Sequence, residues 1–147
     1  MPIYNTPLNI LLAEDDVDDR LFFANALKEI PIATHLTTLK EGAELMNYLH
    51  KNSENLPDIL FLDLSMPLKT GFECLFEIQQ DKKLKDLNVV VFTISFTKNS
   101  FYEGELIHIL NKLGVQNFIR KSDDLKQSKR LIHNILIRVL EKREPNA

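Results

Sequence analysis

Two uninterrupted apolar runs, ILFL at residues 59–62 and VVVF at residues 89–92, most restrict what this chain can fold into. A strand that is apolar at every position has both faces covered, which is typical of a central parallel strand packed between helices. Three more short β-rich runs accompany these two, and segments with helical spacing of apolar residues follow each of the five. The predicted strands are 9–13, 32–39, 58–62, 88–93 and 116–119, and the predicted helices are 17–30, 42–51, 72–80, 101–113 and 124–142.

This strict alternation of strand and helix predicts an α/β fold in which helices cover both faces of a parallel sheet. A chain of 147 residues lies in the usual size range of one domain. We therefore expect a single domain over residues 1–147, with a core from about residue 8 to about residue 142 and a short flexible C-terminal tail.

Composition excludes several classes of function. The net charge of −3 gives no sign of the basic field that binds nucleic acid. Cys74 is the single cysteine, so neither an intrachain disulfide nor a cysteine metal cage can form. No segment has the pattern of a signal peptide or the 18 or more apolar residues of a membrane span. We expect a cytoplasmic protein that contacts neither nucleic acid nor membrane directly.

Polar side chains follow the ends of four predicted strands. The acids at 14–16 follow the first strand and Asp63 follows the third, while Thr93 ends the fourth and Lys121 comes after the fifth. Ligands of open parallel sheets bind at the carboxyl ends of the strands, so these residues are expected to share one edge. Carboxylates hold Mg²⁺, and a lysine with a hydroxyl addresses phosphate oxygens. The pattern predicts a site for a hard cation and a phosphoryl group.

Each of these residues also has an ordinary structural interpretation. Asp16 or Asp18 could cap the following helix, because carboxylates satisfy free amides at a helix N-terminus. Thr93 could be a simple β-branched strand residue, and Lys121 a solvated lysine. Only their joint placement at the ends of four strands favours a functional site.

Four motifs give the chain a resemblance to a known family. They are LNILLAEDD at 8–16, DILFLDLSMPLKTGFE at 58–73, VVVFT at 89–93 and FIRK at 118–121. With these motifs the chain resembles, over nearly its whole length, the receiver domain of two-component response regulators. The resemblance implies a flavodoxin-like sheet in the strand order 2-1-3-4-5 and a stand-alone, single-domain regulator.

The resemblance also implies roles for the acidic residues. Asp63 would be the phosphoacceptor. Asp15 and Asp63 would ligate Mg²⁺ through their side chains, Glu14 would act through bound water, and Ser65 would supply a backbone carbonyl.

Three further residues would form the phosphoryl site and its switch. By resemblance, Thr93 would hydrogen-bond the phosphoryl group, Lys121 would pair with it, and Phe118 is the aromatic residue whose rotamer follows the shift of Thr93. The implied donor is a sensor histidine kinase or phosphotransfer protein, and the implied output is a protein partner or a homodimer. The protein would then be a signalling switch rather than an enzyme, apart from its own phosphotransfer and dephosphorylation.

Three features depart from the family pattern. Ile94 stands where the family usually has a small residue, and its bulk could narrow access to the phosphoacceptor. Ser122 replaces the usual proline after Lys121, and we expect a trans bond because a non-proline cis bond costs about 2.5–4 kcal/mol. Lys121 lies 28 positions after Thr93, and this interval is longer than the family's usual one by more than one helical turn. The extra length is either an altered fourth helix that binds a different partner or a loop insertion that the fold tolerates.

Three other functions are compatible with parts of this pattern. A phosphatase of the haloacid-dehalogenase type needs a second aspartate where this chain has Ser65. A flavin-binding flavodoxin needs a first loop that cradles phosphate, whereas the acids at 14–16 would repel it. A degenerate receiver that works as a phosphorylation-independent interaction module is favoured by Ile94 and Ser122 but opposed by the intact acids and lysine.

Overall fold

The computed structural model describes residues 6–93, 100–115, 117–121 and 124–143. Its strands are β1 (Leu8–Ala13), β2 (Thr34–Leu39), β3 (Ile59–Leu62), β4 (Val89–Thr93) and β5 (Asn117–Arg120). The helices are α1 (Val17–Lys28), α2 (Gly42–Lys51), α3 (Gly71–Gln80), α4 (Ser100–Lys112) and α5 (Leu125–Glu141). Strand and helix alternate throughout, as the sequence predicts.

All five strands belong to one parallel sheet in the order β2-β1-β3-β4-β5. The strand order reverses after β2, so β1 and β3 are neighbours at the centre of the sheet. Every residue of β3 and β4 is buried, which confirms the interpretation of the two apolar runs as central strands. The predicted flavodoxin-like α/β fold is confirmed.

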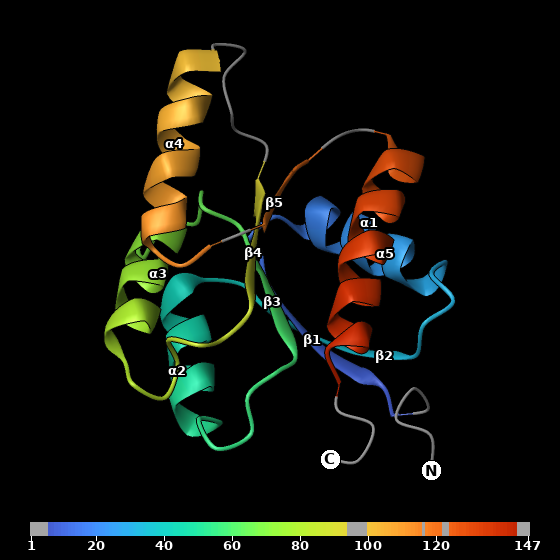
Figure 1. Ribbon diagram of the computed structural model, residues 1–147, viewed down its shortest axis with the longest axis horizontal. Coiled ribbons are helices and arrows are strands. Elements are labelled where there is room, and N and C mark those ends of the chain that lie inside the picture. Colours follow the sequence, from blue (N-terminus) through green and yellow to red (C-terminus); the bar gives the residue numbers. More distant parts are fainter. Residues whose placement is uncertain (1–5, 94–99, 116, 122–123, 144–147) are drawn as a thin grey trace.

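Helices cover both faces of the sheet (Figure 1), with α2, α3 and α4 on one face and α1 and α5 on the other. The first face buries a cluster that includes Leu49 and Cys74. On the second face, the ring of Phe23 on α1 lies 4.9 Å from that of Phe61 and 5.6 Å from that of Phe92. These two apolar layers hold the sheet between the helices and fix the ends of its strands.

Capping residues set several helix starts, and some element boundaries differ from the predicted ones by one or two residues. Asp16 and Asp124 accept a hydrogen bond from the third residue beyond them, so they lie outside α1 and α5 as N-caps. Thr70 and Glu73 form a capping box, and α3 therefore begins at Gly71, one residue earlier than predicted. The α1 helix ends at Lys28, two residues before the predicted end, and β2 begins two residues after its predicted start.

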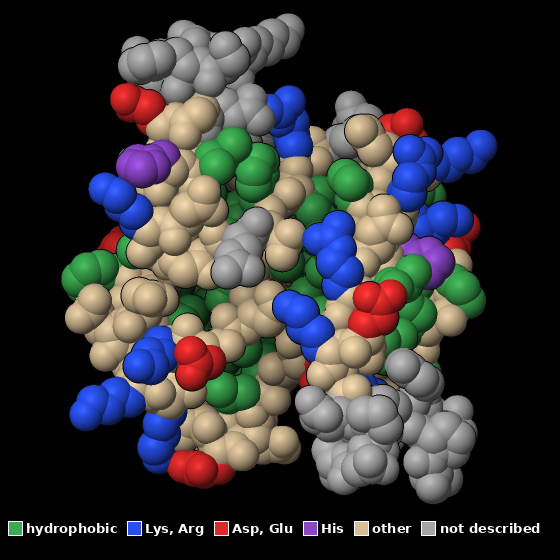
Figure 2. Space-filling view, in the orientation of Figure 1, with side chains coloured by type: hydrophobic (Ala, Val, Ile, Leu, Met, Phe, Trp, Pro, Cys, Tyr) green, Lys and Arg blue, Asp and Glu red, His purple; other side chains and the backbone are tan. Residues whose placement is uncertain are grey.

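Charged side chains of both signs are interspersed with apolar ones over the face shown in Figure 2, and they do not gather there into a field of one sign. Within the described residues, no helix combines the length and the apolar character that crossing a bilayer requires.

Gly71 allows the loop after β3 to lie against its own helix. A Cβ atom at this position would come within 2.5 Å of the Asp63 carbonyl oxygen and 2.7 Å of the Leu64 Cα. We expect Gly71→Ala to lower the free energy of unfolding by about 1–3 kcal/mol, as overpacking does. Urea denaturation monitored by circular dichroism measures this change.

Gly104, in the interior of α4, is the matched control. A Cβ atom there would meet nothing within 4 Å, so Gly104→Ala should leave stability unchanged or raise it by up to about 1 kcal/mol. Equal destabilisation by both substitutions would contradict the close approach at Gly71.

Candidate functional site

Backbone hydrogen bonds align the carboxyl ends of the strands beyond their last paired residues. The Asp63 amide donates to the Ala13 carbonyl at 3.0 Å, and the Lys121 amide donates to the Thr93 carbonyl at 2.8 Å. The Glu14 amide donates to the Leu39 carbonyl at 2.9 Å. The sheet therefore continues into the segments that carry the acids and the lysine, and it fixes their positions.

These segments enclose a pocket of about 200 Å³ at the carboxyl edge of the sheet. Glu14, Asp63 and Thr93 are buried, with exposed fractions of 1%, 4% and 1%. All six residues that the sequence predicts to bind the metal or the phosphoryl group lie together here. The pocket is lined by Glu14, Asp15, Asp16, Asp19, Asp63, Ser65, Thr93 and Lys121.

Three carboxylates in the pocket lie close enough together to form a candidate site for a divalent cation. One carboxylate oxygen from each of Glu14, Asp15 and Asp63 lies within 4.8 Å of the others. Hard cations such as Mg²⁺ prefer carboxylate oxygens, and two of these groups are buried while Asp15 is exposed. The donor set fits a small divalent ion that keeps part of its water shell.

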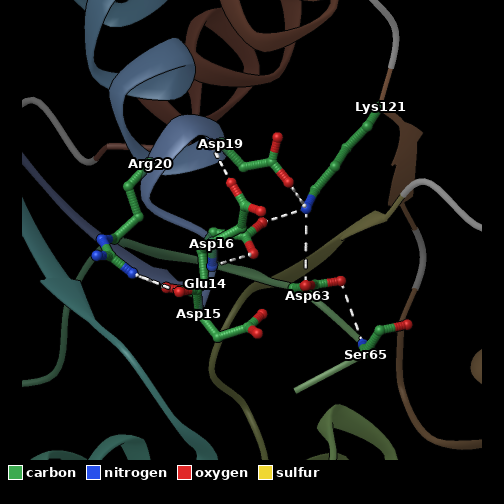
Figure 3. Close-up of polar contacts among 8 residues, drawn as sticks. All are labelled: Glu14, Asp15, Asp16, Asp19, Arg20, Asp63, Ser65 and Lys121. Atoms are coloured by element: carbon green, nitrogen blue, oxygen red, sulfur yellow. Dashed lines mark hydrogen bonds and ion pairs between the residues drawn. The ribbon is translucent and has the colours of Figure 1, made fainter. Parts of the chain in front are cut away.

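The Lys121 ammonium lies among three carboxylates (Figure 3). It donates hydrogen bonds to Glu14 Oε1 and, at 2.9 Å, to Asp19 Oδ2, and it forms an ion pair with Asp63 Oδ2 at 3.6 Å. It also lies 5.5 Å from the centre of the Phe92 ring. Burial acts to lower the pKa of Lys121, but the hydrogen bonds to Glu14 and Asp19 outweigh it, so the pKa is raised and the lysine stays charged.

The carboxyl group of Glu14 has a pKa far above its ordinary value. Burial raises the pKa of its carboxyl group from 4.5 to about 8; the hydrogen bond from Lys121 opposes this shift and the charge of Asp63 adds to it. Its Oε2 atom accepts a hydrogen bond from the Asp16 amide at 3.2 Å. A cation among these acids would favour the ionised form of Glu14, because a metal ligand must give up its proton.

The first turn of α1 supports the pocket through Arg20 and Asp19, whose roles the sequence patterns do not predict. Arg20 Nη1 donates to the backbone carbonyls of Glu14 at 2.8 Å and Asp15 at 2.9 Å, which fixes the segment that carries both acids. Asp19 contacts Lys121, and its amide is capped by Asp16 Oδ1 at 2.9 Å. The five acids in positions 14–19 indicate an acidic site in the sequence. They do not indicate which of these side chains face the pocket.

The loop from β3 to α3 completes the pocket. The Ser65 amide donates to Asp63 Oδ1 at 3.2 Å, and the Gly71 amide closes the loop by donating to the Leu64 carbonyl at 3.1 Å. Leu68 has a positive φ of 65° and is 88% exposed, so the loop turns sharply outward before α3 begins.

The remaining predicted residues lie away from the pocket or outside the described chain. Phe118 is half-buried on β5, where it packs against the apolar layer beneath α2, α3 and α4. Ile94 and the Lys121–Ser122 bond lie outside the described residues. The α4 helix accounts for 13 of the positions between Thr93 and Lys121.

Together, the fold and the pocket define a doubly wound α/β protein with a cation-compatible acidic site beside a partly buried lysine. The profile of the response regulator receiver domain matches residues 10–133. The chain therefore belongs to the response regulator receiver domain family, as the sequence motifs indicate. Receiver domains act as switches in two-component signalling.

Relatives with known names and structures agree with this assignment. The response regulator Rcp1 of Synechocystis sp. is 32% identical over 135 residues, which cover 89% of this chain and 88% of Rcp1. The Mn²⁺-bound form of Rcp1 superposes with a TM-score of 0.77 at 31% identity, covering 96% of this chain and 100% of that one. The phosphorylated cyanobacterial phytochrome response regulator RcpA has the same TM-score at 30% identity, covering 97% of this chain and all of RcpA.

The raised pKa of Glu14 makes stability depend on pH. Between about pH 4.5 and about pH 8, the folded protein holds a proton on Glu14 that the unfolded chain releases, so the free energy of unfolding should fall as pH rises through this range. We expect Glu14→Gln to flatten this decline. Urea denaturation in a metal-chelating buffer at several pH values between 5 and 8 measures it.

The control is Glu105→Gln, which removes an exposed carboxylate from α4. It should leave the wild-type pH dependence unchanged. A Glu14→Gln protein whose stability declines as steeply as that of the wild type would show that Glu14 is not the group responsible.

Proposed function

We propose that this protein accepts a phosphoryl group on Asp63 in a Mg²⁺-dependent reaction and that this modification switches a surface that binds a protein partner or a second copy. Residues 1–147 would act as one receiver domain. The observation that supports this best is the buried Asp63 carboxylate, 3.6 Å from the Lys121 ammonium and grouped with Glu14 and Asp15 around one potential cation site.

The chemistry follows from these positions. A carboxylate oxygen of Asp63 would attack the phosphorus of the donor, and the bond between phosphorus and the donor's leaving group would break as an acyl phosphate forms. Negative charge accumulates on the phosphoryl oxygens, and Lys121 and the Thr93 hydroxyl lie in the same pocket to compensate it.

Asp15 and Asp63 would hold the ion through their side chains, Ser65 through its backbone carbonyl, and Glu14 through bound water. Bound Mg²⁺ supplies charge compensation for the phosphoryl oxygens without proton transfer. The orientation of Glu14 and Asp15 comes from the chain itself, because Arg20 binds the backbone carbonyl of each residue.

The same residues connect the site to the rest of the fold. Phosphorylation adds about −1.5 to −2 charges and three strong acceptors at the end of β3. Drawing Thr93 and Lys121 toward these acceptors would shift the ends of β4 and β5, which the Lys121–Thr93 backbone hydrogen bond joins. Phe118 on β5 would respond to that shift. We propose a sensor histidine kinase or phosphotransfer protein as the donor.

Beryllofluoride, a mimic of the phosphoryl group, tests this function. Added with Mg²⁺, it should raise the stability of the wild type by about 2.7 kcal/mol when free ligand is about 100 times Kd, because it binds only the folded state. Asp63→Asn should abolish this increase. Thermal unfolding measures the stability, and size-exclusion chromatography of the same samples reports self-association.

Asp86→Asn is the matched control, since Asp86 is exposed and lies beside the start of β4, at the opposite edge of the sheet. It should respond as the wild type does. A wild type that responds to neither Mg²⁺ nor beryllofluoride would contradict the proposal and favour a phosphorylation-independent interaction module.

A further inference from the structure

We propose that Asp19 is a positioning residue that keeps the Lys121 ammonium beside Asp63 when Glu14 turns to a bound cation. This inference rests on the proposed phosphoacceptor function. It adds to the pocket a residue on α1 that is neither a cation ligand nor the phosphoacceptor.

The Lys121 ammonium divides its hydrogen bonds between two carboxylates. An ammonium group has three protons to donate. In this structure two of them go to Glu14 and Asp19, while the Asp63 oxygen lies farther away at 3.6 Å. Lys121 is thus held at the mouth of the phosphoacceptor site mainly by two carboxylates beside it.

Glu14 belongs both to the hydrogen bonds of Lys121 and to the candidate cation site. Its carboxylate belongs to the group of three acids whose oxygens lie within 4.8 Å of one another, and Asp19 does not belong to that group. A divalent cation among the three acids, together with the water through which Glu14 would act on it, would compete with Lys121 for the Glu14 oxygens. Asp19 is the carboxylate whose contact with Lys121 does not depend on the cation site being free.

The fold keeps Asp19 in place for this task. Its amide is capped by Asp16, so the residue is fixed in the first turn of α1, and its side chain points toward the Lys121 ammonium (Figure 3). A lysine side chain is long and flexible, so each contact that fixes its ammonium group costs conformational entropy. If Asp19 still holds Lys121 after a cation binds, the lysine loses less conformational entropy when it pairs with a phosphoryl group.

This role and a simple charge effect predict opposite results. If Asp19 were only one more negative charge near an anion site, its removal would strengthen the binding of an anionic phosphoryl mimic. If Asp19 positions Lys121, its removal weakens that binding.

The experiment compares wild type, Asp19→Ala and Asp18→Ala by isothermal titration of beryllium in excess fluoride, with Mg²⁺ present. Asp19 is 31% exposed on its side chain, so the substitution opens no core cavity. We expect Asp19→Ala to bind the mimic roughly fivefold to tenfold more weakly, the effect of about one net hydrogen bond. Asp18 is an exposed acid of the same helical turn, and Asp18→Ala should bind as the wild type does.

A second readout follows the lysine itself. Proton–nitrogen correlation spectra resolve lysine ammonium groups that are protected from exchange with water, and Lys121→Arg assigns the signal. We expect the Lys121 signal to persist in the wild type after Mg²⁺ is added. In Asp19→Ala it should be present without Mg²⁺, while Glu14 still holds the lysine, and should be lost when Mg²⁺ is added.

The outcomes separate this inference from the function on which it rests. A wild type that does not bind beryllofluoride overturns both. Unchanged or tighter binding by Asp19→Ala, or an equal loss in Asp18→Ala, overturns the positioning role alone. A Lys121 signal that survives Mg²⁺ in Asp19→Ala also overturns it.

Discussion

The Lys121 ammonium, on a side chain that is only 9% exposed, stabilises the acidic carboxyl edge of this sheet. The parallel fold brings Glu14 and Asp63 together at exposed fractions of 1% and 4%, where two unpaired carboxylates would be strongly destabilising. Lys121 contacts both, and Asp19 contacts Lys121 from α1. Burial still raises the pKa of Glu14 above its ordinary value, although the hydrogen bond from Lys121 acts to lower it. The remaining imbalance suits a site that gains further positive charge from a divalent ion.

In the proposed switch, Lys121 would change its hydrogen-bond and ion-pair partners when the ion and the phosphoryl group bind. Without an ion, Glu14 and Asp19 hold the ammonium, and Asp63 is only an ion-pair neighbour. Under this proposal, an ion on the acids would free the lysine from Glu14, and a phosphoryl group on Asp63 would give it a stronger partner. Because the Lys121 backbone is bonded to Thr93, a movement of the lysine is shared by the ends of β4 and β5. In this proposal, the charge chemistry of the pocket would reach the edge strand β5 through the backbone contact between Lys121 and Thr93.

The sequence predicts the fold and most of the pocket because both depend on short-range patterns. Unbroken apolar runs indicate central parallel strands, and residues just beyond strand ends must share one edge, which is why Asp63 and Lys121 could be placed together. Asp19 and Arg20 could not be predicted, because their contacts depend on how α1 packs and which face of its first turn points inward. The start of α3 was missed by one residue because the capping box at Thr70 decides it.

Chemical trapping of the phosphorylated residue tests the central claim most directly. The protein is incubated with phosphoramidate, with and without Mg²⁺, reduced with borohydride to convert an aspartyl phosphate into homoserine, and digested for mass spectrometry. We predict homoserine at position 63 only, and only when Mg²⁺ was present. Conversion at another carboxylate, equal conversion without the ion, or no conversion would contradict the assignment of Asp63 as the phosphoacceptor.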